Sequence, residues 1–378
     1  MKKFLALLLA LTMALALVAC GGGDDAASDT TADSGDDAAA STGEFEEMTW
    51  KFACSATETS PWVDGAKEFA RIVGEKTGGA ITVQYYPADQ LTAGNQTDGI
   101  QALMDGTTEL SMHSNLIWSS FDQRFNVVSL PFLFSSTEEA DAALDGAGGE
   151  ALGEILESTY NVHLLGIAEN GFRHITNSKH AIASKADMNG LKMRVAGSQL
   201  LNRSYELWGA DYTNANWSEV FTALQTGTYD GQENPLGIIT GNKFEVRMPG
   251  SAENLSASIQ EVQSYLTYWT GAYDCLFFCM NAELYNSLSP ELQAIVDEAG
   301  QAACEYEREL NRSQDQEIMD KWAEAGVEIT ELTPEAAAEF AEASAPVYDE
   351  FADELTPELI EAFTSVTQAE AGTTEPAA

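Results

Sequence analysis

Met48-Thr-Trp-Lys-Phe-Ala-Cys54 begins a stretch in which strand and helix patterns alternate. This run predicts a strand, and residues 61–77 predict a helix because their apolar residues recur at helical spacing. Residues 81–86 predict a second strand, 98–105 a second helix and 109–113 a third strand. A β-α-β-α-β order indicates an α/β fold with a mostly parallel sheet covered by helices.

The alternation recurs further along the chain. Strands are predicted at 162–167 and 191–195, and helices at 198–207 and 217–226. Two more strand-like runs lie between 264 and 280, followed by amphipathic helices predicted at 290–325 and from 334 onward. The chain from residue 46 to 365 is long enough for two domains with good cores.

The N-terminus has the features of an export signal. Lys2 and Lys3 precede an apolar run over residues 4–18, which is shorter than a membrane-spanning helix. The run ends in Leu17-Val18-Ala19-Cys20, which resembles a bacterial lipobox whose cysteine is diacylated. We therefore expect a lipoprotein signal peptide over 1–20 with lipidation at Cys20. The alternative is an ordinary secreted start with an incidental cysteine.

Two terminal segments are poor in large apolar residues. Residues 21–45 are predicted to form a disordered tether, since they cannot bury enough surface to offset ordering entropy. Residues 366–378 are predicted to form a flexible tail. A tether after a lipidated cysteine would hold the folded part off the outer face of the cytoplasmic membrane.

Charge restricts the class of partner. The chain has 60 acidic and 18 basic residues, a formal net charge of −42. Such a charge argues against nucleic acid or an anionic membrane surface as partner. Spread over many helices, the acidic residues are more typical of solvated faces. An anionic ligand would have to be attracted by local cations.

The remaining cysteines give no disulfide framework and no paired CxxC spacing of a zinc site. They are expected to be buried free thiols: Cys54, Cys275, Cys279 and Cys304.

No common catalytic motif is present. The sequence lacks a P-loop, H-E-x-x-H, G-x-S-x-G and an EF-hand loop. Gly146-Ala-Gly148-Gly149 begins like a dinucleotide fingerprint, but no strand precedes it, so it predicts a turn between helices. The four histidines fall in no recognisable catalytic spacing. No cofactor, no metal and no enzymatic activity are expected.

Four ordered motifs resemble one known family. They are Leu130-Pro-Phe-Leu-Phe134, Glu169-Asn-Gly-Phe-Arg-His174, Met188-Asn-Gly-Leu-Lys-Met-Arg-Val195 and the segment from Ser218 to Pro235 that ends in Gln-Glu-Asn-Pro. Together they resemble the substrate-binding subunit of tripartite ATP-independent periplasmic (TRAP) transporters, the DctP family. The resemblance runs from about residue 50 to 363.

The resemblance implies a two-domain, type II-like periplasmic-binding-protein fold with hinge strands and a long connecting helix. Domain I would comprise residues 46–169 plus about 262–300. Domain II would comprise 170–261 plus about 301–365.

The resemblance also implies ligand-binding residues. Arg194 matches the family arginine that forms a bidentate pair with a ligand carboxylate, a role that suits a planar guanidinium in a closed cleft. Arg173 matches a second family arginine, Asn170 follows the same pattern, and Asn234 matches an asparagine that binds ligand. Trp217 falls where the family places an aromatic wall. Alternatively, Arg194 could form a structural ion pair and Trp217 could be core.

Further candidates come from the first domain. Ser55 and Glu58 follow its first strand, and Ser114 and Asn115 follow its third. Carboxyl ends of strands are where open α/β sheets place ligand sites. The alternative is that these residues only satisfy turns.

The sequence departs from the family pattern in three places. Ala196 stands where proline is usual, Gly271 replaces a common histidine, and residues 245–259 look inserted. The insertion adjoins the expected hinge and could alter the pocket rim or the surface offered to the permease.

The implied function is an extracytoplasmic receptor that binds a small organic acid, closes over it and docks on sodium-coupled permease subunits. It is expected to be a monomer. Dicarboxylates, sugar acids, keto acids and aromatic acids all remain open as ligands. The alternatives are a sensor co-receptor lipoprotein, an extracellular enzyme, or the receptor of an ATP-driven transporter.

Overall fold

The computed structural model describes residues 45–241, 244–247 and 254–371. The expected signal peptide, Cys20 and almost all of the expected tether lie outside the described residues. Helix α12 (Pro357–Ala371) includes the first residues of the segment 366–378 that was expected to be a flexible tail. Residues 372–378 lie outside the described part.

The first sheet has five strands in the order β2-β1-β3-β12-β4. Their bounds are β1 (Met48–Cys54), β2 (Ile81–Tyr86), β3 (Leu110–Ser114), β4 (Val162–Phe172) and β12 (Tyr273–Asn281). Strand β1 runs parallel to β2 and β3, as the N-terminal pattern predicts. Strand β12 is antiparallel to both β3 and β4, so the sheet is mixed and the expectation of a mostly parallel sheet was wrong. The reason is that β12 returns from the second sheet in the opposite direction.

The second sheet has six strands in the order β13-β11-β5-β8-β6-β7. Their bounds are β5 (His174–Asn177), β6 (Lys192–Val195), β7 (Asp211–Asn214), β8 (Gly231–Asn234), β11 (Tyr265–Tyr268) and β13 (Glu328–Glu331). Strands β7, β6 and β8 are parallel neighbours, whereas β5 is antiparallel to β8 and β11.

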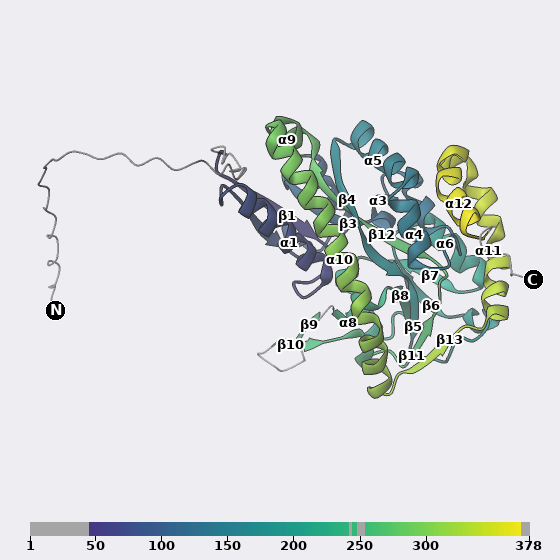
Figure 1. The fold of residues 1–378 in the computed structure, drawn as a ribbon. Helices are drawn as coiled ribbons and strands as arrows, with labels where there is room; N and C mark the ends of the chain where they lie inside the picture. Colours follow the sequence, from purple (N-terminus) through teal and green to yellow (C-terminus); the bar gives the residue numbers. More distant parts are fainter. Residues whose placement is uncertain (1–44, 242–243, 248–253, 372–378) are drawn as a thin grey trace, which may run out of the picture. The chain divides into compact units, whose positions relative to one another are not determined.

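Two chain segments pass directly between the sheets. Strand β4 continues through Arg173 into β5, and β11 leads into β12 through residues 269–272. Helix α10 (Pro290–Glu324) contacts strand β4 of the first sheet and helix α1 (Figure 1). It also contacts helix α8, which follows strand β8 of the second sheet. At 35 residues it is about 52 Å long. These features confirm the α/β fold with hinge strands and a long connecting helix.

The other helices cover the faces of the two sheets. Their bounds are α1 (Pro61–Lys76), α2 (Gln96–Met104), α3 (Asn115–Trp118), α4 (Thr137–Leu144), α5 (Ala147–Tyr160), α6 (Gln199–Trp208), α7 (Trp217–Gln225), α8 (Leu236–Gly241), α9 (Ala282–Ser287) and α11 (Pro334–Leu355). A turn between α4 and α5 is present at Gly146, as predicted, but residues 147–149 of the glycine-rich run form the start of α5 instead of the turn. Helix α12 packs on α4 and α5. The expected domain boundaries stay a prediction.

The core of the first sheet is organised around β12, all nine residues of which are buried. Phe278 points to the side of α1, where its ring lies 5.1 Å from that of Phe69. The neighbouring Phe277 points to the other side, where its ring lies 5.3 Å from that of Phe125. Because successive side chains of a strand face opposite ways, β12 contributes to apolar packing on both faces of the sheet.

Local sequence explains where α1 begins and ends. Ser60 is the N-cap and Pro61 occupies the first turn, where its missing N–H costs no hydrogen bond. Gly78 follows the C-cap with φ +63°, a conformation that glycine adopts at little cost.

The segment expected as an insertion contains a strand pair. Strands β9 (Phe244–Arg247) and β10 (Asn254–Ala257) pair antiparallel as a separate two-stranded sheet. This pair accounts for most of residues 245–259 within the described part of the chain.

The four cysteines of the described residues are free and buried, as expected. Burial raises the pKa of each thiol above its ordinary value.

Candidate ligand-binding site

A cavity between the two sheets gathers most of the predicted site residues. Seven of them line it: Ser55, Ser114, Asn170, Arg173, Arg194, Trp217 and Asn234. Ser55 directly follows β1, and Ser114 and Asn170 lie in β3 and β4 of the first sheet. Arg194 and Asn234 lie in β6 and β8 of the second sheet. The cavity volume is about 30 Å³, room for only a few water molecules. Pockets for small organic ligands are usually about 300–1,000 Å³.

Arg194 has no carboxylate within ion-pair distance among the described residues. Its Nε and Nη2 both donate to the backbone carbonyl of Ala215, at 3.0 and 2.7 Å. Its guanidinium carbon lies 5.6 Å from the centre of the Trp217 ring, within range of a cation–π interaction. Only 2 % of the residue is exposed, and burial lowers the pKa of Arg194 to about 10. The guanidinium is therefore a buried charge with no ion pair among the described residues, although the more distant carboxylate of Glu233 partly offsets the effect of burial on its pKa.

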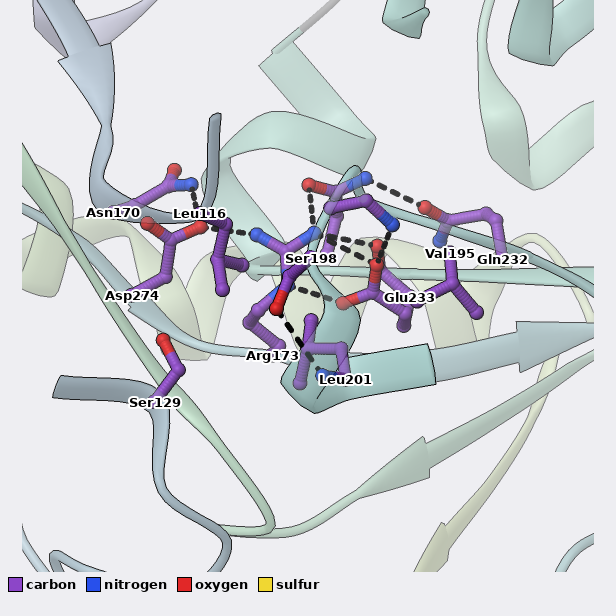
Figure 2. Close-up of polar contacts among 12 residues, drawn as sticks. Leu116, Ser129, Asn170, Arg173, Val195, Ser198, Leu201, Gln232, Glu233 and Asp274 are labelled. Atoms are coloured by element: carbon purple, nitrogen blue, oxygen red, sulfur yellow. Dashed lines mark hydrogen bonds and ion pairs between the residues drawn. The ribbon is translucent and has the colours of Figure 1, made fainter. Parts of the chain in front are cut away.

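Arg173 differs from Arg194 because carboxylates bind it from both sheets (Figure 2). It forms ion pairs with Glu233 of β8 and with Asp274 of β12. Its Nη2 also donates to the Asn234 side-chain oxygen at 2.9 Å. Burial alone would lower the pKa of Arg173, but Glu233 and Asp274 raise it above its ordinary value. The charge of Arg173 is thus balanced within the protein.

Asp274 connects Arg173 to the first sheet. Its Oδ2 accepts from Asn170 Nδ2 and its Oδ1 from the Ser114 hydroxyl, both at 2.7 Å. Burial raises the pKa of Asp274, and the positive charge of Arg173 opposes this rise. Five of the cavity's polar side chains consequently belong to one hydrogen-bonded group: Arg173, Asp274, Asn170, Ser114 and Asn234.

Two buried oxygens at the cavity, an amide carbonyl acceptor and a hydroxyl that can donate or accept, have no hydrogen-bond partner within the described chain. They are the Asn170 Oδ1 and the Ser55 Oγ. Buried polar atoms are normally paired, so unpaired ones in a cavity wall mark a place where a ligand can donate.

Two of the predicted site residues do not line this cavity. Glu58 is exposed and forms an ion pair with Lys67 of α1. Asn115 is buried at the start of α3, where its Nδ2 donates to Phe125 O and Ser129 Oγ and its Oδ1 accepts from Cys275 N. Both side chains satisfy local structure, which is the alternative reading of loop polar residues.

Sequence reasoning missed Asp274 and Glu233. Asp274 is the lone acid in the otherwise apolar strand β12, and a buried charge of that kind requires a partner. That signal could have identified it. Glu233 lies inside the Gln-Glu-Asn-Pro motif, next to the predicted Asn234. Gln96 of α2 also lines the cavity, and its side-chain oxygen accepts from Trp217 N at 3.3 Å.

A larger groove of about 510 Å³ lies between α5, β4 and α10 but does not suit an anion. Its cation, Arg308, is bound to Asp145 and to the backbone carbonyl of Ile167. Glu150, Glu157 and Glu305 also line it. For metal ions, the described residues contain no group of three or more His, Cys, Asp or Glu side chains suitably placed.

The family model of the bacterial extracellular solute-binding proteins, family 7 (DctP), matches residues 52–355. The chain belongs to this family. Members of the DctP family are extracytoplasmic binding proteins. Within the described residues, no helix combines the length and apolar composition needed to span a membrane.

Relatives and solved structures place this DctP-family chain among binding proteins for organic acids. It is 31% identical over 292 residues to the 2,3-diketo-L-gulonate-binding periplasmic protein YiaO of Escherichia coli (strain K12). The aligned region covers 77% of this chain and 84% of the relative. It is 28% identical over 324 residues to the C4-dicarboxylate-binding periplasmic protein DctP of Rhodobacter capsulatus. The aligned region covers 85% of this chain and 92% of that relative. The sugar acid binding protein DctPAm of Advenella mimigardefordensis, in complex with galactonate, has a TM-score of 0.78 at 27% identity, covering 86% of this chain and 99% of that one.

Proposed function

We propose that this protein is the extracytoplasmic receptor of a TRAP transporter, and that it captures a small organic carboxylate for delivery to the permease without catalysis. The observation that carries the proposal is Arg194, a buried cation at a cavity with no carboxylate partner among the described residues. A ligand carboxylate can form a bidentate pair with such a guanidinium. The relatives named for 2,3-diketo-L-gulonate, C4-dicarboxylates and galactonate support the same class of ligand.

Ligand entry requires the cavity to widen, since a volume of about 30 Å³ is far too small for an organic acid. The walls belong to two sheets joined at Arg173 and at residues 269–272, so opening takes the form of a hinge motion about these crossings. A ligand that contacts both walls favours the closed form.

Anchoring and partners complete the proposal. A signal peptide over 1–20 and a lipid on Cys20 would hold the protein at the outer face of the cytoplasmic membrane, with residues 21–45 as the tether. The partners would be the large and small membrane subunits of a sodium-coupled TRAP permease. The receptor would act as a monomer.

A thermal-shift screen of the purified protein against organic acids tests the proposal. A ligand at about 100 times its Kd should stabilise the protein by about 2.7 kcal/mol. We expect at least one carboxylate to shift the wild type and Glu58→Gln, whose side chain lies outside the cavity, but not Arg194→Met. No shift with any acid, alongside a clear shift with a neutral compound or a cation, would rule out the proposed Arg194 clamp.

A further inference from the structure

The charges at the cavity cancel. Two cations, Arg173 and Arg194, and one anion, Asp274, line it, and the second anion, Glu233, binds Arg173 from behind the wall. All four side chains are almost fully buried. The cavity therefore offers no net positive charge, unlike a site built from two free arginines.

The two arginines are not equivalent toward a ligand. Arg173 is held between Glu233 and Asp274, so a ligand carboxylate next to it would also approach those two carboxylates (Figure 2). Arg173 can still donate a hydrogen bond, since a guanidinium has two N–H on Nη1 and Asp274 accepts only one. Within the part of the chain that the structure describes, the Arg194 guanidinium contacts the Ala215 carbonyl and the Trp217 ring and forms no ion pair. One full charge-to-charge pair is thus available, and it is at Arg194.

The wall built from the first sheet presents acceptors. Asp274 carries the negative charge there, and the Asn170 Oδ1 and Ser55 Oγ are buried and unpaired within the described chain. A ligand hydroxyl can bond to all three groups. A carboxylate can accept from the Ser55 hydroxyl, but it has no hydrogen to donate to Asn170 Oδ1 or Asp274 and would face Asp274 with like charge.

We propose that the cavity selects hydroxylated monocarboxylic acids over dicarboxylic acids, with Asp274 as the residue that determines this specificity. The ligand carboxylate binds Arg194, and hydroxyls at the far end of the ligand bind Asp274, Asn170 and Ser55. This inference rests on the proposed function and narrows its ligand class. The relatives are named for both classes of acid, so the distinction comes from the charges of this chain.

Matched acids provide the test. D-erythronate and meso-tartrate differ only in a terminal hydroxymethyl or carboxylate group, and so do galactonate and galactarate. Isothermal titration calorimetry at pH 8 gives the ratio of Kd values within each pair. We expect the monocarboxylate to bind at least about tenfold more tightly than its dicarboxylate partner, which corresponds to about 1.4 kcal/mol. A dicarboxylate that binds as tightly as its monocarboxylate partner would overturn the inference.

Two variants assign the effect to Asp274. Asp274→Asn removes the negative charge that a second ligand carboxylate would face, while Glu233 still pairs with Arg173, so we expect the Kd ratio to move at least about tenfold toward the dicarboxylate. The matched control is Asp122→Asn, which removes an aspartate paired with Arg124 outside the cavity and should leave the ratio unchanged. An unchanged ratio in folded Asp274→Asn would refute the role of Asp274. The wild-type ratio does not depend on whether that variant folds.

The two proposals fail in different ways. Tight dicarboxylate binding that is lost in Arg194→Met keeps the receptor function and refutes the selectivity. Binding of neutral compounds in place of any acid refutes both.

Discussion

Replacing Arg194 with methionine should stabilise the protein while abolishing ligand binding. The buried guanidinium has no carboxylate partner in the described residues, and burial lowers its pKa from the ordinary value to about 10. The folded state therefore disfavours the charged form relative to the unfolded state. At about 1.4 kcal/mol for each unit of pKa, the cost is about 3 kcal/mol at neutral pH. Methionine removes this cost and keeps an unbranched side chain beside Trp217.

A smaller loss opposes this gain. The Ala215 carbonyl loses the two hydrogen bonds it accepts from Arg194, and leaving this partly buried carbonyl unpaired costs about 1–2 kcal/mol. The expected net gain in free energy of unfolding is about 1–2 kcal/mol. The cost of the charge is present at every pH below about 10 and is lost only as pH rises through that value, so the gain should be constant between about pH 6 and 9.

Equilibrium unfolding in urea, without ligand, measures the difference. Arg124→Met is the matched control, since Arg124 pairs with Asp122 at the surface and its removal should be neutral or slightly destabilising. If Arg194→Met proves less stable than the wild type by more than about 1 kcal/mol, Arg194 is a structural residue and the reasoning from its unpaired charge fails.

Two further predictions concern the crossing region between the sheets. Burial lowers the pKa of His174 to about 3, so the unfolded state gains a proton near pH 6.5 that the folded state does not, and stability falls with decreasing pH below that value. His174→Gln should reduce the loss between pH 7 and 5 by about 1–2 kcal/mol in urea unfolding; equal losses in both proteins would contradict this. Gly171 in β4 has φ +103°, a backbone conformation that is unfavourable for alanine, so Gly171→Ala should destabilise the protein by about 1–2 kcal/mol. No atom lies closer than 3.7 Å to the added Cβ, so the cost comes from the backbone and not from a steric clash. Gly153→Ala, in the regular helix α5, is the control and should cost nothing or gain up to about 1 kcal/mol; similar losses in both would argue against backbone strain at Gly171.

The sequence predicts the elements whose signals are local. Strand alternation and helical spacing give β1 to β3 and α1 nearly to the residue, and motifs bring Arg173, Arg194 and Asn234 to one cavity. The direction of β12 is not local, because it depends on the chain returning from the other sheet. Spacing also cannot show that Asp274 neutralises Arg173, since the two lie 101 residues apart.

Two predicted site residues lie outside the cavity for a similar reason. Glu58 follows β1 as a ligand-binding loop residue would, but Lys67 on the next helix attracts it outward. Asn115 follows β3 correctly, yet its amide satisfies the backbones of Phe125 and Cys275. The position of each residue along the chain was predictable, whereas the direction of its side chain depends on partners that only the fold brings together.

The buried free cysteines bear on how the protein can be made and stored. Cysteine reacts as the thiolate, and burial raises the pKa of all four thiols and keeps oxidants away from them. The described fold contains no disulfide, so it needs no oxidase or isomerase to mature. Expression in a reducing or an oxidising compartment should yield the same folded protein, and dithiothreitol should leave its melting temperature unchanged.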